Sequence, residues 1–309
     1  MFGIKSFAFI LVTLLSQLIL AQEKKQTGKF QKEYSIPFHL TEYNNLAVQA
    51  ILNQKDTVQL MFHTAANDLT LTEDAVQKLR TIHFNANTDS IKSWGGSVNS
   101  SRLSKNNFVQ IAGLTWENVP IWENKNSGQH TDGKFGIDLF ANKVIEIDFD
   151  QMMIRIFTNL PAKSKQYGKL ALSFENENMF IDLGFKMGDS TFHNKFLIHS
   201  GYAGGLLFDD KFANEHSLGE KLKIVGEKSL KDSYGNVLKT KKAIMPLVTI
   251  GNEPLTDVPV GFFEGAIGRQ KMSIMGGDIV KRFNLIIDAE RKFIYLKPSG
   301  LAALDYFNL

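Results

Sequence analysis

Two histidines stand at matching places in the sequence, and each is followed by a residue with a small hydroxyl side chain. His63 precedes Thr64, and His199 precedes Ser200 and Gly201. An imidazole can act as a general base near pH 7 or bind a metal ion. Two histidines alone make an incomplete zinc site, which needs a third ligand or a bound water. The chain has no cysteine, so its composition excludes thiolate chemistry and a disulfide framework.

The segments that lead to the two histidines repeat the same pattern. Residues 46–62 form an alternating apolar stretch, a polar turn at 53–55 and a second apolar stretch. Residues 179–198 repeat this order, with the turn at 187–190. Alternation bounded by turn residues predicts a β-hairpin in each half. A short helix is expected after each hairpin, at residues 72–79 and 209–216.

The ends of the two halves also correspond. Lys134-Phe135-Gly136 is followed by a short helical stretch and a hairpin, and Ile274-Met275-Gly276 is followed by the same elements. Self-similarity of this kind indicates a duplicated unit. We therefore expect two β-rich halves of similar design, related by an approximate two-fold axis.

The first residues predict export. Lys5 is followed by an apolar run over residues 7–20 and by the small residue Ala21, as in a secretory signal peptide. A retained membrane anchor is the alternative, although the run is short for a full span. Export without cysteine suits a bacterial periplasm or cell surface. The expected organisation is a signal peptide at 1–21, an N-terminal lobe at 22–160, a Lys-rich linker at 161–168 and a C-terminal lobe at 169–309.

The composition argues against several classes of function. The chain has 309 residues, 43% of them hydrophobic, and a net charge of only +3. Because lysine and arginine are spread along the chain, nucleic-acid binding is not expected. No later segment has the length or apolarity of a membrane span, and no phosphate loop or dinucleotide fingerprint is present. We therefore expect no cofactor, no bound metal and no membrane contact once the signal peptide is removed.

These motifs resemble those of the pepsin and retropepsin superfamily, in particular the exported bacterial two-lobe aspartyl-protease-like proteins. In that family each lobe has a strand ending in Asp-Thr-Gly or Asp-Ser-Gly, and an apolar-apolar-Gly segment passes beneath it. The resemblance covers roughly residues 35 to 300. It implies an all-β fold with short helices, in which two pseudo-symmetric β-barrel lobes enclose a central cleft. The four matching segments are His63-Thr64-Ala65, His199-Ser200-Gly201, Lys134-Phe135-Gly136 and Ile274-Met275-Gly276.

The chain departs from this pattern where catalysis takes place. His63 and His199 occupy both dyad positions, Ala65 replaces a glycine, and Lys134 replaces an apolar residue. An aspartic dyad needs one protonated and one ionised carboxyl group around a shared water, and two imidazoles do not reproduce it. We therefore expect an inactive pseudo-peptidase. By resemblance, the supports of the two loops are Thr64, Ser200, Gly201, Gly136 and Gly276.

Two other functions remain open from the sequence. Histidine makes up 7 of the 309 residues, so two histidines at equivalent positions are a rare coincidence. That coincidence favours a hydrolase that uses the His63 and His199 pair, with or without a metal ion. A β-rich structural or adhesion component is the third interpretation.

A hairpin is expected over the cleft in each half. Trp94, Gly95 and Gly96 lie in the first, and Tyr234 lies in the second. In the family such a hairpin closes over an extended peptide, which it binds through backbone hydrogen bonds and side-chain pockets. We therefore expect an extended peptide or protein segment as the partner. A monomer is expected, because two joined lobes need no second chain to complete the cleft.

Overall fold

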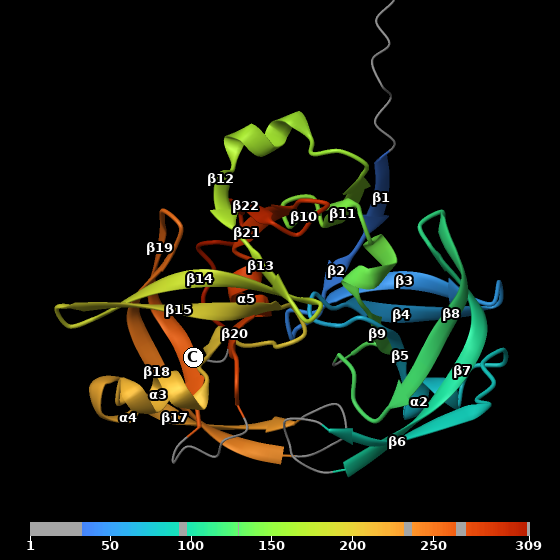
Figure 1. The fold of residues 1–309 in the computed structure, drawn as a ribbon, viewed down its shortest axis with the longest axis horizontal. Helices are drawn as coiled ribbons and strands as arrows, with labels where there is room; N and C mark the ends of the chain where they lie inside the picture. Colours follow the sequence, from blue (N-terminus) through green and yellow to red (C-terminus); the bar gives the residue numbers. More distant parts are fainter. Residues whose placement is uncertain (1–32, 93–97, 129, 232–236, 264–269, 308–309) are drawn as a thin grey trace, which may run out of the picture. The chain divides into compact units, whose positions relative to one another are not determined.

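The computed structural model describes residues 33–92, 98–128, 130–231, 237–263 and 270–307, and strands make up most of them. These strands form three sheets. Two sheets close into barrels that lie side by side, and the third lies at their junction (Figure 1). The expected fold class, mainly β with two pseudo-symmetric barrel lobes, is confirmed.

The first barrel contains the hairpin that leads to His63. Its sheet has eight strands, and an extra pairing between the strands at 46–52 and 98–111 closes it. A short helix, α2 (Glu73–Val76), follows the fifth strand of the chain, and Thr72 caps it by accepting a hydrogen bond from the Ala75 N–H. In pairing order the strands are β2 (His39–Leu40), β3 (Leu46–Leu52), β4 (Asp56–Phe62), β9 (Gly133–Phe135), β5 (Leu69–Thr72), β8 (Leu114–Asn124), β7 (Val98–Ile111) and β6 (Ala86–Lys92).

The second barrel repeats this plan around His199. Its eight-stranded sheet is closed by the pairing of the strands at 178–187 and 237–250. Two short helices, α3 (Asp210–Glu215) and α4 (Leu218–Lys221), follow the hairpin. In pairing order the strands are β13 (Ser173–Glu175), β14 (Asn178–Met187), β15 (Ser190–His199), β20 (Ser273–Gly276), β16 (Leu206–Leu207), β19 (Glu253–Phe262), β18 (Val237–Ile250) and β17 (Lys223–Lys231).

The two barrels match strand by strand in pairing order, which supports the duplication inferred from the sequence. In the first barrel β4 runs parallel to β9, with Phe62 opposite Phe135. In the second, β15 runs parallel to β20, with Ile198 opposite Met275. This register places each apolar-Gly segment beside the strand that leads to a histidine. The fold therefore brings distant parts of each half to one point.

The third sheet contains strands from both halves, which the sequence did not reveal. At its centre β10 pairs with β21, with Ile145 opposite Ile287. Both central strands are buried along their whole length, as expected of strands covered on both faces. In pairing order the strands are β1 (Glu33–Pro37), β11 (Met153–Phe157), β10 (Val144–Asp148), β21 (Phe283–Ile287), β22 (Phe293–Pro298) and β12 (Gly168–Ala171).

Short helical turns connect the barrels to this sheet. The turn η1 (Ile137–Phe140) follows β9, and α5 (Gly277–Val280) follows β20. The segment expected as a linker contains a third turn, η2 (Ala162–Gln166). In this turn Lys163 forms an ion pair with the fully buried Glu146, with a Nζ–Oε1 distance of 2.7 Å.

Phenylalanine rings fix the loop that carries His63. Phe62, Phe135 and Phe140 are almost completely buried, and their ring centroids lie 5.3 to 6.1 Å apart. Burial of one such ring contributes about 1.5–3 kcal/mol, and favourable ring geometry adds to it. These three rings join the end of β4, β9 and η1, so they set the position of the residues on either side.

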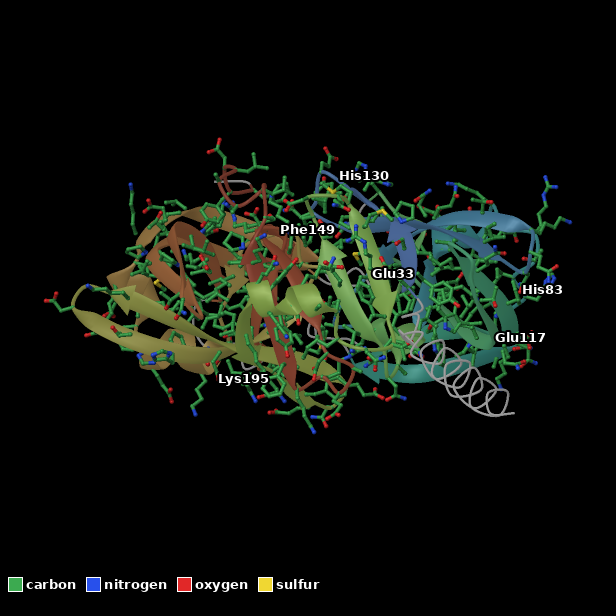
Figure 2. The ribbon with its side chains drawn as sticks, turned by 90° about the horizontal axis from the view of Figure 1, so that it is seen from above. Glu33, His83, Glu117, His130, Phe149 and Lys195 are labelled. Atoms are coloured by element: carbon green, nitrogen blue, oxygen red, sulfur yellow. The ribbon has the colours of Figure 1, made fainter. Side chains whose placement is uncertain are left out.

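A second aromatic contact lies at the junction of the halves. Phe38 and Phe149 pack edge to face at 5.6 Å, and Phe149 lies near the middle of the molecule in Figure 2. The backbone N–H of Phe149 donates to Asn284 Oδ1 of the second half at 2.7 Å. In the same view His83 lies at the outer edge of the first barrel. Among the described residues, no helix has the length and apolarity needed to cross a membrane.

Candidate functional site

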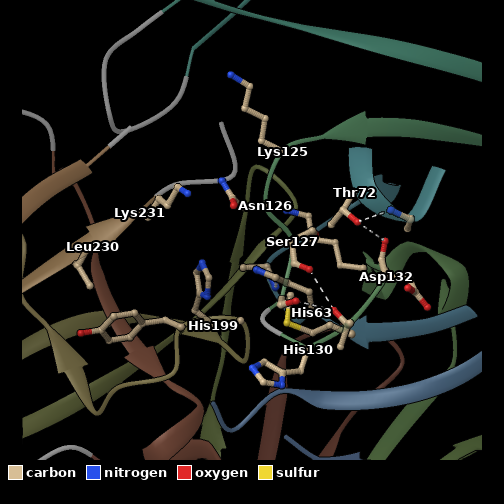
Figure 3. A pocket seen from close by; sticks show the side chains of 18 of the residues that line it. His63, Thr72, Lys125, Asn126, Ser127, His130, Asp132, His199, Leu230 and Lys231 are labelled. Atoms are coloured by element: carbon tan, nitrogen blue, oxygen red, sulfur yellow. Dashed lines mark hydrogen bonds between the residues drawn. The ribbon is translucent and has the colours of Figure 1, made fainter. Parts of the chain in front are cut away.

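The two histidines meet at the junction of the lobes. His63 follows β4 and His199 ends β15, and their ring centroids lie 4.4 Å apart with the planes at 63°. Both side chains line a cavity of about 740 Å³ that residues of both barrels surround (Figure 3). The structure therefore brings together the two residues that the sequence placed at equivalent positions.

Thr64 and Ser200 connect the two histidine loops. The Thr64 N–H donates to Ser200 Oγ at 3.0 Å, and the Ser200 N–H donates to Thr64 Oγ1 at 3.0 Å. Each hydroxyl then donates to a carbonyl of the opposite lobe, Ile198 at 2.7 Å and Phe62 at 2.8 Å. Both side chains are fully buried, where hydrogen bonds are costly to lose.

Gly136 and Gly276 allow the two apolar-Gly segments to pass close to these loops. A Cβ at Gly136 would collide with the carbonyl oxygen of Ala66, and one at Gly276 would collide with that of Gly204. Any larger residue would therefore push the segment away from its loop. The two glycines lie at equivalent places in the halves and meet the same kind of obstacle.

The tautomer of His63 follows from one hydrogen bond. The backbone N–H of Ala65 donates to His63 Nδ1 at 3.0 Å, so Nδ1 is an acceptor and the neutral ring carries its proton on Nε2. The other edge of the ring packs on Gly201, where a Cβ would lie 2.5 Å from Nε2. The glycine of the second loop therefore makes room for the imidazole of the first.

His199 has different surroundings. Its Nδ1 is buried and has no hydrogen-bond partner among the described residues. The next residue beyond the motif, Tyr202, lines the cavity and packs against Gly204 and Gly276. Burial raises the pKa of Tyr202 to about 12, so its hydroxyl stays protonated. The two histidine loops thus differ in detail although their backbones match.

Both imidazoles are neutral at pH 7. Burial lowers the pKa of His63 well below its usual value, and the nearby His199 and Lys134 lower it further. Burial, followed by the charge of Lys134, lowers the pKa of His199 to about 4. Two neutral rings in contact cannot supply the shared negative charge on which an aspartic dyad depends.

Lys134 is the most unusual residue of the site. It lies on β9, between Met61 of β4 and Thr70 of β5, and its side chain reaches the cavity. It keeps some surface toward the cavity but is otherwise surrounded by protein, and this burial lowers its pKa to about 8. Its charge acts on both histidines. The sequence showed Lys134 only as a departure from the apolar pattern.

Several residues of the cavity wall were not predicted. Lys78, Lys125 and Lys231 line it, as do Asp74 and Asp132. They come from α2 and the loops around it, from the segment before β9, and from the end of β17, so no single motif contains them. Only Tyr202 had a signal in the sequence, because it directly follows His199-Ser200-Gly201.

Trp94, Gly95, Gly96 and Tyr234 lie outside the described residues. The strands on either side of them are present, β6 with β7 and β17 with β18. The paired strands of both expected hairpins are therefore present on either side of these residues.

The part of the chain that the structure describes contains no group of three or more His, Cys, Asp or Glu residues that could hold a metal ion. His130 also lines the cavity, but its Nε2 lies 3.0 Å from Glu42 Oε1 near the surface. The histidine pair therefore has no third ligand of these types within that region.

Comparison with known proteins supports the fold. No protein-family model matches the sequence, and no curated protein matches it. Among solved structures, 410 chains are similar to it. One is the aspartic proteinase from Irpex lacteus, with a TM-score of 0.58 and 13% identity over 88% of this chain and 99% of that chain. At this identity the likeness shows the fold alone, which is that of a two-lobed, pepsin-like aspartic proteinase.

Proposed function

We propose that this chain is an exported protein that binds an extended peptide in the cavity between its lobes and does not cleave it by aspartic-peptidase chemistry. The main observation is that the rings of His63 and His199 meet on the floor of a cavity of about 740 Å³, with their centroids 4.4 Å apart. In a fold of this kind that floor is where a catalytic pair of carboxyl groups would lie.

The contact between the rings argues against aspartic chemistry. The dyad mechanism needs space between two carboxyl groups for a water that one activates while the other polarises the substrate carbonyl. Here two larger rings fill the space between the loop tips, and Gly201 packs against one of them. The hydroxyls of Thr64 and Ser200 are fully buried and engaged across the lobes, so they are unsuited to act as nucleophiles.

Peptide binding is supported by the two-barrel architecture around the cavity. The cavity is lined by residues of both barrels, among them Leu230 and Lys231 at the end of β17. Its size is within the range of cavities that bind small ligands and peptide segments. The apolar run near the N-terminus supports export, and two lobes in one chain support a monomer.

A binding assay and a cleavage assay together test this proposal. A library of unstructured eight-residue peptides is added to the full chain, and its melting temperature is measured. We expect some peptides to raise it by several degrees at saturating concentration. Mass spectrometry of the same mixtures between pH 3 and 8 is expected to show uncut peptides. Cleavage that disappears in His63→Ala would overturn the proposal that the chain does not cleave peptides, in favour of a histidine-based hydrolase.

A variant that fills the cavity, compared with a matched control variant, tests where the peptides bind. Ala65 lines the cavity and is partly exposed, whereas Ser173 is exposed on β13, outside the lining. The variant Ala65→Trp is expected to remove the stabilisation by peptides, and Ser173→Trp is expected to retain it. If neither variant changes the stabilisation, the peptides bind elsewhere. If no peptide stabilises the native chain, the binding proposal is wrong.

A further inference from the structure

The floor of the cavity is basic. His63, His199 and Lys134 all line it, and the charge of Lys134 lowers the pKa of both imidazoles. A pair of carboxyl groups at this place would give the floor a negative charge. The three side chains present here carry only nitrogen donors and acceptors, and any charge they gain is positive.

The fold does not require a lysine at position 134. Its equivalent in the second barrel is Ile274, which lies beside Leu197 on β15 just as Lys134 lies beside Met61 on β4. An apolar residue fits this position in one lobe, while the other lobe buries an amine at a cost in solvation. A buried ionisable group with a shifted pKa in a cavity is a candidate for function.

The walls of the cavity add positive charge. Apart from the histidines, the charged side chains among its described lining residues are four lysines and two aspartates, Lys78, Lys125, Lys134, Lys231, Asp74 and Asp132. Lys125 and Lys231 lie on the same side of the pocket in Figure 3, above His199 in that view. Asp132 is already engaged, since its Oδ2 accepts the Gln59 N–H at 2.8 Å. A surface of this kind attracts anions.

One buried atom of the floor has unused hydrogen-bonding capacity. Nδ1 of His199 is buried and has no partner among the described residues, and such atoms are rare in folded proteins. Because this atom has almost no exposed surface, a bound anion acts on it only through the charge of the ring. A neutral apolar ligand would leave it as it is.

We propose that the cavity selects peptides that carry a carboxylate, which binds over the floor formed by His63, His199 and Lys134. This inference rests on the proposed peptide binding and names the chemistry that the site recognises. Charge-assisted hydrogen bonds from ammonium and imidazole to a carboxylate are the strong class of hydrogen bond. The carboxylate belongs either to an Asp or Glu side chain or to the carboxyl end of a peptide.

Calorimetric titration of the full chain with four peptides tests the inference. Three are nine residues long, have blocked ends and differ only in the central residue, which is Glu, Gln or Lys. The fourth ends at the central Gln with a free carboxylate. We expect the Glu peptide, the free-carboxylate peptide or both to bind at least about tenfold more tightly than the blocked Gln peptide. The tighter of the two identifies the source of the carboxylate.

Variants at Lys134 locate the recognition. Lys134→Met is expected to remove the preference for the carboxylate, so that it binds the carboxylate peptides and the blocked Gln peptide with similar affinity. Lys134→Arg keeps the charge and is expected to retain part of the preference. Lys186 is exposed on β14 outside the cavity, so Lys186→Met serves as the control and should bind like the native chain.

The results separate this inference from the proposed function. If neither the Glu peptide nor the free-carboxylate peptide binds more tightly than the blocked Gln peptide, the carboxylate inference is overturned and peptide binding stays intact. A preference that persists in Lys134→Met would also overturn it, because the carboxylate would then be recognised elsewhere. If none of the four peptides binds, both proposals are wrong for this class of ligand.

Discussion

The backbone N–H of Thr64 donates to the hydroxyl of Ser200 at 3.0 Å, and the N–H of Ser200 donates to the hydroxyl of Thr64 at the same distance. These bonds join the two histidine loops without using either histidine. The spacing of the loops is therefore set by two buried hydroxyl residues. Changes at His63 or His199 should alter the chemistry of the site more than its position.

The first prediction concerns the stability that this pair provides. Thr64→Val keeps the shape of the side chain but leaves the Ser200 N–H and the Ile198 carbonyl without a partner. We expect a loss of about 2–4 kcal/mol in the free energy of unfolding, measured by urea denaturation. Thr191→Val, at an exposed position of β15, is the control and should change it by less than about 0.5 kcal/mol. Equal effects at both sites would contradict the prediction.

The second prediction concerns the contact between Gly201 and His63. In Gly201→Ala the new Cβ would lie 2.5 Å from His63 Nε2, so the imidazole must move. Overpacking of this kind costs about 1–3 kcal/mol. Adding His63→Ala should recover most of that loss, which a double-mutant cycle measures as a coupling energy.

Another glycine is the control for this cycle. A Cβ at Gly219 would meet its nearest neighbour, Phe262, at an ordinary 3.8 Å. Gly219→Ala should therefore leave stability unchanged or increase it, because Gly219 lies in the short helix α4. Additive effects of Gly201→Ala and His63→Ala would show that the two residues do not press on each other.

The third prediction is the dependence of stability on acid. The pKa of His199 is about 4 in the folded chain and near its usual 6.5 when unfolded. Between these values the unfolded state binds a proton that the folded state does not, so stability falls as the pH falls from about 6.5 to 4. The contribution of His199 reaches about 3 kcal/mol, and His63 acts in the same direction.

Urea denaturation at several pH values between 7 and 4.5 checks this dependence. His199→Gln cannot take up the proton, so its stability should fall less steeply than that of the native chain. Carboxyl groups elsewhere titrate in both proteins, and comparing the two removes their effect. The same slope in both proteins would show that His199 is not buried in neutral form.

The fourth prediction is that removing a charge stabilises the protein. Burial lowers the pKa of Lys134 to about 8 from its usual 10.5, so the unfolded state binds the proton more tightly. Native stability should therefore rise by up to about 3 kcal/mol between pH 8 and 10.5. Lys134→Met should lack this rise and should be more stable than the native chain at pH 7, as often seen when a functional group is removed.

The same variant should change the histidines. Without the charge of Lys134, the pKa values of both His63 and His199 should increase. NMR titration of the imidazole resonances measures this directly, and Lys186→Met should leave them unchanged. Unaltered histidine pKa values in Lys134→Met would place the ammonium farther from the rings than the structure does.

Most of the barrel architecture could be predicted because it is local and repeated. The turns expected at 53–55 and 187–190 lie between β3 and β4 and between β14 and β15. Alternating side chains and polar turns encode such hairpins within a few residues. The third sheet could not be predicted, because the pairing of β10 with β21 joins strands far apart in the chain. The residues of each strand, VIEID in β10 and FNLII in β21, carry no information about which strand will be its partner.

The sequence predicted the two histidine loops of the site but not the charged residues around them. Repetition alone identified His63, His199 and the hydroxyl residue after each. The importance of Lys134 depends on the parallel pairing of β4 with β9, which places its side chain near both imidazoles. The lysines and aspartates of the wall come from separate segments. Only the folded chain shows that they share one cavity.

The six-stranded sheet at the junction has a consequence for how the chain could be divided. Because β10 and β21 are neighbours at its centre, a cut between the halves would turn these two buried strands into bare edges. Such edges invite pairing with other chains. We expect separately produced halves to aggregate or to reassemble with each other. Each half of the duplicated chain thus depends on the other to cover its central strand.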